Sequence, residues 1–146
     1  MEIGTISNIY LLIFTPFLAS MLCQIFQFKN AGFSVALFSL FVVSLLAVKI
    51  FPDVLIYEKI KNDYDLSLIS LALEFSLDLI GMIFLFIILF MEAIIIIFYR
   101  KDIENILTNR NQAIFYSVFL INLFSLIGIL TTNNLFNLFI FIEIHS

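Results

Sequence analysis

Long apolar runs separated by short polar segments dominate the chain from start to end. A helix needs about 20 apolar residues to cross the hydrocarbon core of a bilayer. Four runs come close to or exceed this length: residues 9–28, 33–51, 77–99 and 113–130. A fifth run, residues 133–146, is too short to cross. The pattern predicts an all-α fold: a polytopic transmembrane helix bundle forming a single transmembrane domain over residues 1–146.

The polar segments predict how consecutive helices are connected. Residues 27–32 are expected to form a tight turn, which makes the first two helices antiparallel neighbours. Pro52 directly follows the second run and is expected to close that helix, because proline has no backbone N–H. The next segment, residues 53–76, is longer, and its second half, LSLISLALEF, is compatible with a short strand pair or a surface helix. Residues 100–111 are expected to form a short polar loop.

Composition places the chain in the membrane class. Hydrophobic residues make up 63% of it and charged residues 12%, whereas soluble domains have about 25% charged residues. The mean hydropathy is +1.16. The lipid bilayer is therefore the expected partner, and the net charge of -4 argues against a nucleic-acid partner.

The residue types needed for most catalytic and metal chemistry are scarce. The chain has one cysteine, Cys23, and one histidine, His145. An internal disulfide, a thiolate or histidine metal site and a nucleophilic hydrolase set are therefore not expected. The sequence predicts a protein that is not an enzyme, with no catalytic residue, no metal and no cofactor.

Basic residues in short loops indicate the orientation of the helices. Four fall on one predicted side and three on the other: Lys29, Arg100, Lys101 and Arg110 against Lys49, Lys59 and Lys61. The side with the majority is expected to be cytoplasmic, which places the N-terminus outside. No basic residue precedes the first run, so that run is expected to be a retained span and not a signal peptide.

Two carboxylates fall inside apolar runs, Glu92 and Glu143. A charged residue at bilayer depth costs about 2.5–3.5 kcal/mol on insertion scales, which makes each a candidate functional residue. Glu92 has the alternative of reaching towards the interface near Arg100 or facing a helix contact. Glu143 has the alternative of being a solvated acid on a helix that never inserts. Asn133 and Asn137 share a helix face that excludes Glu143, and such amides are expected to hydrogen-bond between helices.

Two stretches resemble one known family. LALEFSLDLIGMIF, Leu71–Phe84, is similar to the start of the third helix in the antiporter-like subunits of respiratory complex I (NADH-quinone oxidoreductase) and of Mrp multisubunit Na+/H+ antiporters. TTNNLFNLFIFIEI, Thr131–Ile144, resembles the start of the fifth helix in that family. The resemblance implies that Glu74 and Asp78 are structural acids at the start of the third helix. It also implies that Glu143 is the glutamate used in proton translocation.

The resemblance covers only the N-terminal part of that family. It implies a bacterial inner (cell) membrane, an outside N-terminus and other subunits of a membrane antiporter or respiratory complex as partners. Glu92 matches no functional residue of the family, and the lysine that partners the translocating glutamate belongs to a later helix. The expected function is a truncated fragment of a proton/cation antiporter-like membrane subunit that is inactive in transport alone. The alternative is a small multi-span membrane interaction or assembly protein without transport activity.

Overall fold

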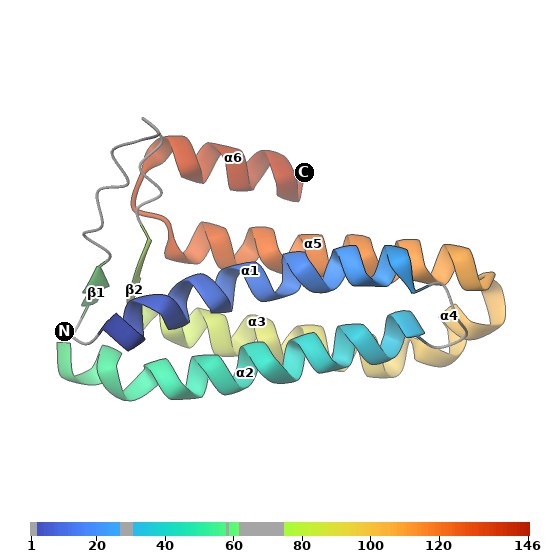
Figure 1. Ribbon diagram of the computed structural model, residues 1–146, viewed down its shortest axis with the longest axis horizontal. Coiled ribbons are helices and arrows are strands. Elements are labelled where there is room, and N and C mark those ends of the chain that lie inside the picture. Colours follow the sequence, from blue (N-terminus) through green and yellow to red (C-terminus); the bar gives the residue numbers. More distant parts are fainter. Residues whose placement is uncertain (1–2, 27–30, 58, 62–74) are drawn as a thin grey trace.

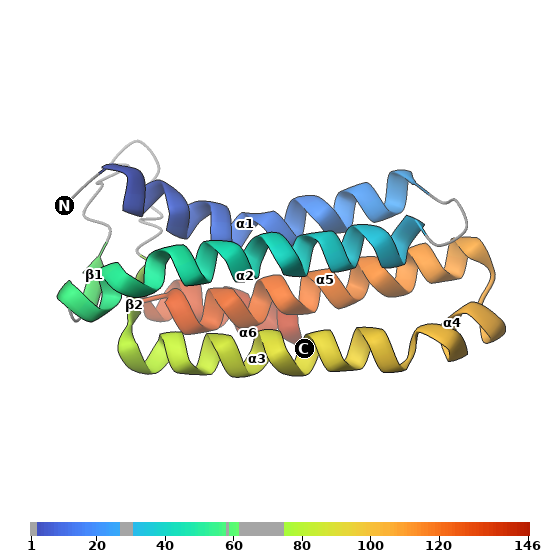
Figure 2. The same ribbon diagram turned by 90° about the horizontal axis from the view of Figure 1, so that it is seen from below.

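The computed structural model describes residues 3–26, 31–57, 59–61 and 75–146. Its architecture is a bundle of long helices that lie side by side along the molecule (Figures 1 and 2). The long helices are α1 (Ile3–Ile25), α2 (Ala31–Tyr57), α3 (Leu79–Phe98) and α5 (Asn109–Thr131). Two shorter helices complete the described part, α4 (Arg100–Ile106) and α6 (Leu135–His145). The predicted all-α bundle is confirmed.

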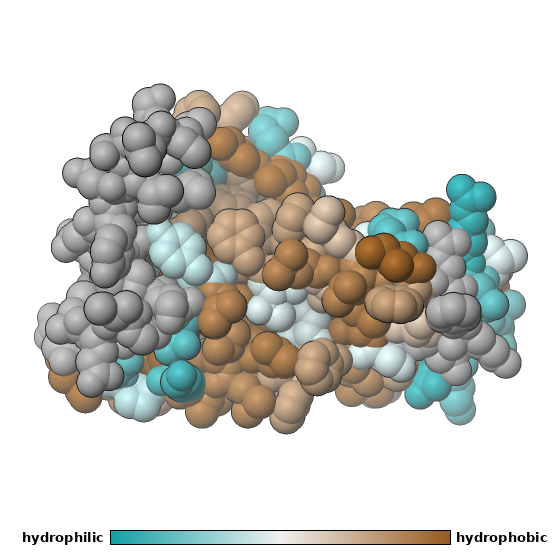
Figure 3. Space-filling model, viewed as in Figure 1, coloured by the Kyte–Doolittle hydropathy of each residue, from teal (hydrophilic) through white to brown (hydrophobic). Residues whose placement is uncertain are grey.

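The four long helices are each long and apolar enough to cross a membrane. At most half of the residues in each candidate span are buried inside the bundle, so much of each helix is left to face lipid. Figure 3 shows hydrophobic residues over the middle of the helices and hydrophilic residues at the end where α4 lies. The chain is therefore an integral multi-pass membrane protein.

Consecutive long helices are antiparallel, and α1 lies against both α2 and α5 (Figure 1). Pairs of aromatic rings lie at the contacts between long helices. Phe17 of α1 lies 5.3 Å from Phe124 of α5, and Phe51 of α2 lies 5.9 Å from Phe86 of α3, measured between ring centroids. All six helices contribute to one continuous apolar core, which gives the bundle a defined packing.

Pro52 does not close the second helix, contrary to the sequence-based expectation. The helix α2 continues through Pro52 to Tyr57. A proline inside a helix removes one backbone hydrogen bond and is tolerated in membrane helices when neighbouring groups compensate. The additional turn is packed, because Val54 is fully buried in the core. Tertiary packing therefore offsets the local cost of the proline.

The segment after α3 is a helix and not the expected polar loop. Arg100–Ile106 forms α4, in which Arg100 Nε lies 2.7 Å from Glu104 Oε1 one turn later. Ile103 is buried and attaches the helix to the core. The helical period places Arg100 beside Glu104 and leaves Ile103 facing the bundle, which explains why this polar stretch folds.

The expected short strand pair between the second and third long helices is confirmed. The strand β1 (Lys59–Lys61) pairs antiparallel with β2 (Ser76–Asp78), with Ile60 opposite Leu77. Both strands lie outside the predicted LSLISLALEF stretch. Of that stretch the structure describes only its last residue, Phe75, which forms an isolated bridge with Thr132 at the end of α5. This bridge ties the start of α3 to the connection between α5 and α6.

Candidate functional site

Asp78 caps the start of α3. Its backbone is extended, and its carboxylate oxygen Oδ1 accepts a hydrogen bond of 2.7 Å from the Gly81 N–H. A carboxylate in this position satisfies one of the N–H groups that an α-helix leaves without an internal partner. Asp78 therefore stabilises the start of α3. Glu74, the other expected acid, lies outside the described residues.

Glu92 lies inside the bundle. Its side chain is only 6% exposed, and the neighbours on the same face of α3, Leu89 and Ile96, belong to the apolar core. Within the described part of the chain, Glu92 Oε2 has no hydrogen-bond partner. The side chain therefore does not extend towards the membrane interface, which was one of its two alternatives. Arg100, the basic residue at that end of α3, forms its ion pair with Glu104 instead.

A short extended connection separates α5 from α6 and turns the chain back on itself. The side chain of Asn134 caps α6, because its Oδ1 accepts a hydrogen bond of 2.9 Å from the Phe136 N–H. The helix α6 then lies beside the C-terminal half of α5 and runs antiparallel to it (Figure 1). Two α6 side chains are buried, those of Asn137 and Phe141. The amide at position 137 is thus placed at a helix contact, whereas Asn133 precedes α6, so the two residues do not share a helix face as expected.

The approach of α6 to α5 depends on a glycine. A Cβ atom at Gly128 would lie 2.3 Å from two carbon atoms of the Phe141 ring. The ring lies between two other aromatic side chains, with centroid distances of 6.2 Å to Phe75 and 5.4 Å to Phe124. The sequence of residues 131–144 predicts an apolar helix, but it does not indicate that the Phe141 ring packs against Gly128.

Glu143 lies on the opposite side of α6 from these contacts and is exposed. Its neighbour His145 does face α5, with Nδ1 3.3 Å from Ser125 Oγ. Glu92 is buried in the bundle, whereas Glu143 is exposed on α6, which packs against α5, so the two acids are not brought into one site. The two acids inside the apolar runs therefore have opposite environments, one in the core and one on the surface of the bundle.

The described residues contain no group of three or more His, Cys, Asp or Glu side chains arranged to hold a metal ion. Nor is any Lys or Arg among the side chains that the structure records as buried. Neither Glu92 nor Glu143 therefore has a buried basic partner within this part of the chain.

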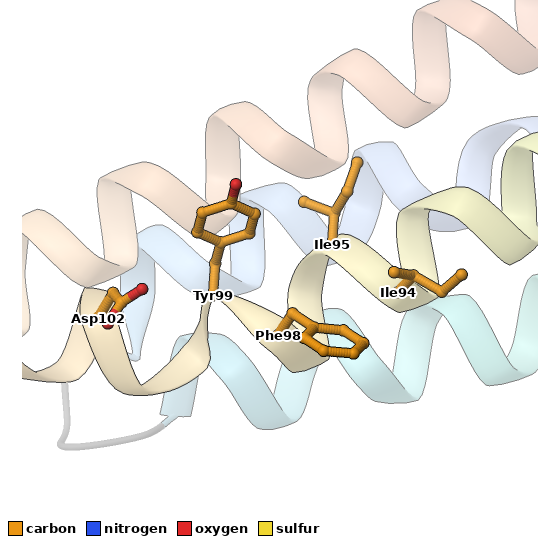
Figure 4. Close-up of a pocket in the computed structure, with 5 residues that line it drawn as sticks. All are labelled: Ile94, Ile95, Phe98, Tyr99 and Asp102. Atoms are coloured by element: carbon orange, nitrogen blue, oxygen red, sulfur yellow. The ribbon is translucent and has the colours of Figure 1, made fainter.

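Two hollows at the junction of α3 and α4 were not anticipated from the sequence. One has a volume of about 420 Å³ and is lined by Ile94, Ile95, Phe98, Tyr99 and Asp102 (Figure 4). The other has a volume of about 370 Å³ and is lined by Phe33, Ile97, Phe98, Arg100 and Lys101. They share Phe98 but differ in charge, because the first has an acid at its edge and the second has two bases.

No protein-family model matches the chain, and neither a curated protein nor a solved structure matches it.

Proposed function

We propose that this chain supplies the N-terminal helices of a proton/cation antiporter-like membrane subunit, of the Mrp or NADH-quinone oxidoreductase type, and that it does not transport ions alone. The proposal rests on the two motif stretches and on the local structure of their residues. Asp78 caps a helix at the end of the first stretch, and Asn134 caps a helix within the second. Both motifs therefore coincide with the beginning of a helix, as the resemblance requires.

The observation that carries the proposal is the position of Glu143. It follows the buried face formed by Asn137 and Phe141 but points away from α5, on the surface of α6. A translocating glutamate needs a basic group beside it within the membrane, and no Lys or Arg of the described helices is among their buried side chains. The exposed face of α6 is where helices of further transmembrane segments or subunits would meet this carboxylate.

The isolated chain is expected to move neither sodium nor protons. Purified protein in proteoliposomes should dissipate a pH gradient no faster than empty vesicles do, and Glu143→Gln should change nothing there. In membrane vesicles from cells that carry the chain at its native locus, Glu143→Gln should lower sodium-dependent proton flux by at least about twofold. The physical reason is that glutamine cannot release a proton, whereas the side-chain size is retained.

Two variants control for loss of folding in the native vesicles. Glu143→Asp keeps a titratable carboxylate and should retain part of the flux. Asp102→Asn removes an exposed acid from α4 and should leave the flux unchanged. Sodium-dependent flux by the isolated chain would contradict the proposal. Full flux in native vesicles with Glu143→Gln would favour the alternative of an interaction or assembly protein without transport activity.

We also propose that the N-terminus faces the outside of a bacterial cell membrane. The support is the distribution of basic residues, because Arg100, Lys101 and Arg110 gather at the α4 end of the bundle. In a Cys23→Ala background, Glu104→Cys should react with an impermeant thiol reagent only after the cells are opened. Asp63→Cys, placed in the segment between β1 and β2, should react in intact cells. Reaction of both from the same side would contradict a bundle with these spans.

A further inference from the structure

The hollow of about 370 Å³ lies where α2 begins and α3 ends, and its lining combines apolar and basic side chains. Phe33, Ile97 and Phe98 provide the apolar part, and Arg100 and Lys101 provide the basic part. Phe33 lies in the first turn of the candidate span of α2, and Phe98 ends the candidate span of α3. The hollow is therefore at the boundary between the hydrocarbon core and the headgroup layer of a bilayer.

Arg100 is held in place beside this hollow but keeps donors available. Its guanidinium carbon lies 4.3 Å from the centroid of the Phe33 ring, and its Nε lies 2.7 Å from Glu104 Oε1. The side chain is still 42% exposed. A guanidinium has five N–H donors in a planar arrangement that suits phosphate, and the ion pair with Glu104 uses the one on Nε. Lys101, which is exposed, adds a second positive charge.

We propose that this hollow binds the headgroup of an anionic phospholipid such as phosphatidylglycerol. Arg100 and Lys101 contact the phosphate, while Phe33, Ile97 and Phe98 contact the upper part of an acyl chain. The occupant is a lipid because the apolar wall continues directly into the part of α3 that faces lipid, and because an anionic headgroup complements the two bases. The neighbouring hollow in Figure 4 has Asp102 at its edge and repels the same headgroup.

The absence of tryptophan from the chain allows a direct test. Phe98→Trp places a single fluorophore at the hollow, on a side chain that is 77% exposed and needs no core space. Bilayers of phosphatidylglycerol and phosphatidylcholine are prepared in two forms, with brominated acyl chains on one lipid or on the other. Bromine quenches the fluorophore on contact. The ratio of quenching in the two preparations therefore measures which lipid lies beside position 98 more often. The expected preference for phosphatidylglycerol is about fivefold.

Single-charge variants in the Phe98→Trp background separate a bound lipid from general attraction to a charged surface. Lys101→Gln and Arg100→Gln are each expected to abolish the preference, so that the two brominated lipids quench the fluorophore equally. Arg110→Gln, which removes the same charge from an exposed position on α5 at the same end of the bundle, is expected to keep it. If Arg100→Gln prevents folding, Lys101→Gln still decides the test, because its side chain is exposed.

Three outcomes would overturn the proposal. One is equal quenching by the two brominated lipids. Another is an equal loss of preference in Lys101→Gln and Arg110→Gln, which would mean attraction by diffuse surface charge. The third is loss of the preference when inorganic phosphate is added, which would show that the two bases take up a free anion and not a lipid.

Discussion

Replacing Gly128 with alanine is expected to release α6 from the bundle. The new Cβ would lie 2.3 Å from Cδ1 and Cε1 of Phe141 and 2.6 Å from its Cγ, so the whole ring has to move. Phe75 and Phe124 flank the ring and restrict that movement. Overpacking of this kind costs about 1–3 kcal/mol.

Few side chains of α6 are buried against the bundle. All of its residues are described, and only Asn137 and Phe141 among them are buried. A steric clash at Phe141 therefore weakens the main apolar contact between α6 and the bundle. We expect the docked fraction to fall by roughly 5- to 150-fold relative to the undocked one, as the energy range implies.

Cross-linking between α5 and α6 measures this docking. Ser125→Cys and His145→Cys are combined with Cys23→Ala, because Ser125 Oγ and His145 Nδ1 lie 3.3 Å apart. A short thiol cross-linker should join the two cysteines in bilayers, and Gly128→Ala should reduce the yield sharply. Undiminished cross-linking in Gly128→Ala would show that Phe141 does not lie against Gly128.

Two further variants establish that the effect is steric. Leu126→Ala changes a less buried position on α5 and should leave the cross-linking yield unchanged. Combining Gly128→Ala with Phe141→Leu removes the aromatic ring but keeps an apolar side chain. This double variant should recover part of the yield, because the Cβ at position 128 then has space.

Replacing Glu92 with leucine is expected to stabilise the bundle by about 1–3 kcal/mol. Glu92 is 6% exposed, and its Oε2 has no hydrogen-bond partner within the described residues. Leucine has no polar atom that requires a partner, and it matches the neighbouring Leu89 and Ile96 in character. Unfolding in bicelles with increasing SDS, followed by circular dichroism, measures the change.

Whether replacing an acid raises or lowers the stability of the bundle should depend on how buried that acid is and on whether it has a partner. Glu92→Gln retains a buried polar group and is expected to give a smaller gain. Glu104→Leu removes the half-buried partner of Arg100 on α4 and is expected to lower stability by at most about 1 kcal/mol. A destabilised Glu92→Leu protein would mean that the carboxylate is held by a favourable interaction in the membrane. A stabilised variant that also loses ion flux in native vesicles would identify Glu92 as a residue kept for function.

The sequence determined the class and the main elements of this protein. The four long apolar runs predicted α1, α2, α3 and α5, because a bilayer requires helices of a minimum length whose backbone groups are paired internally. The same reasoning identified the short α6, and the sequence allowed a strand pair before α3 but placed it in residues 66–75, next to the observed strands. The acid at position 78 was also recognised as a residue at the start of a helix, because the resemblance placed it there.

Only the tertiary structure decided which faces of these helices are inside. Periodicity gives little help in a chain this apolar, because lipid-facing and core-facing residues have the same character. The burial of Glu92 and the exposure of Glu143 follow from which helices pack on α3 and α6, and the local sequence around each acid does not determine either. The continuation of α2 through Pro52 and the fit of Phe141 to Gly128 have the same origin. In each case a local pattern permits several outcomes, and contacts between segments distant in sequence select one.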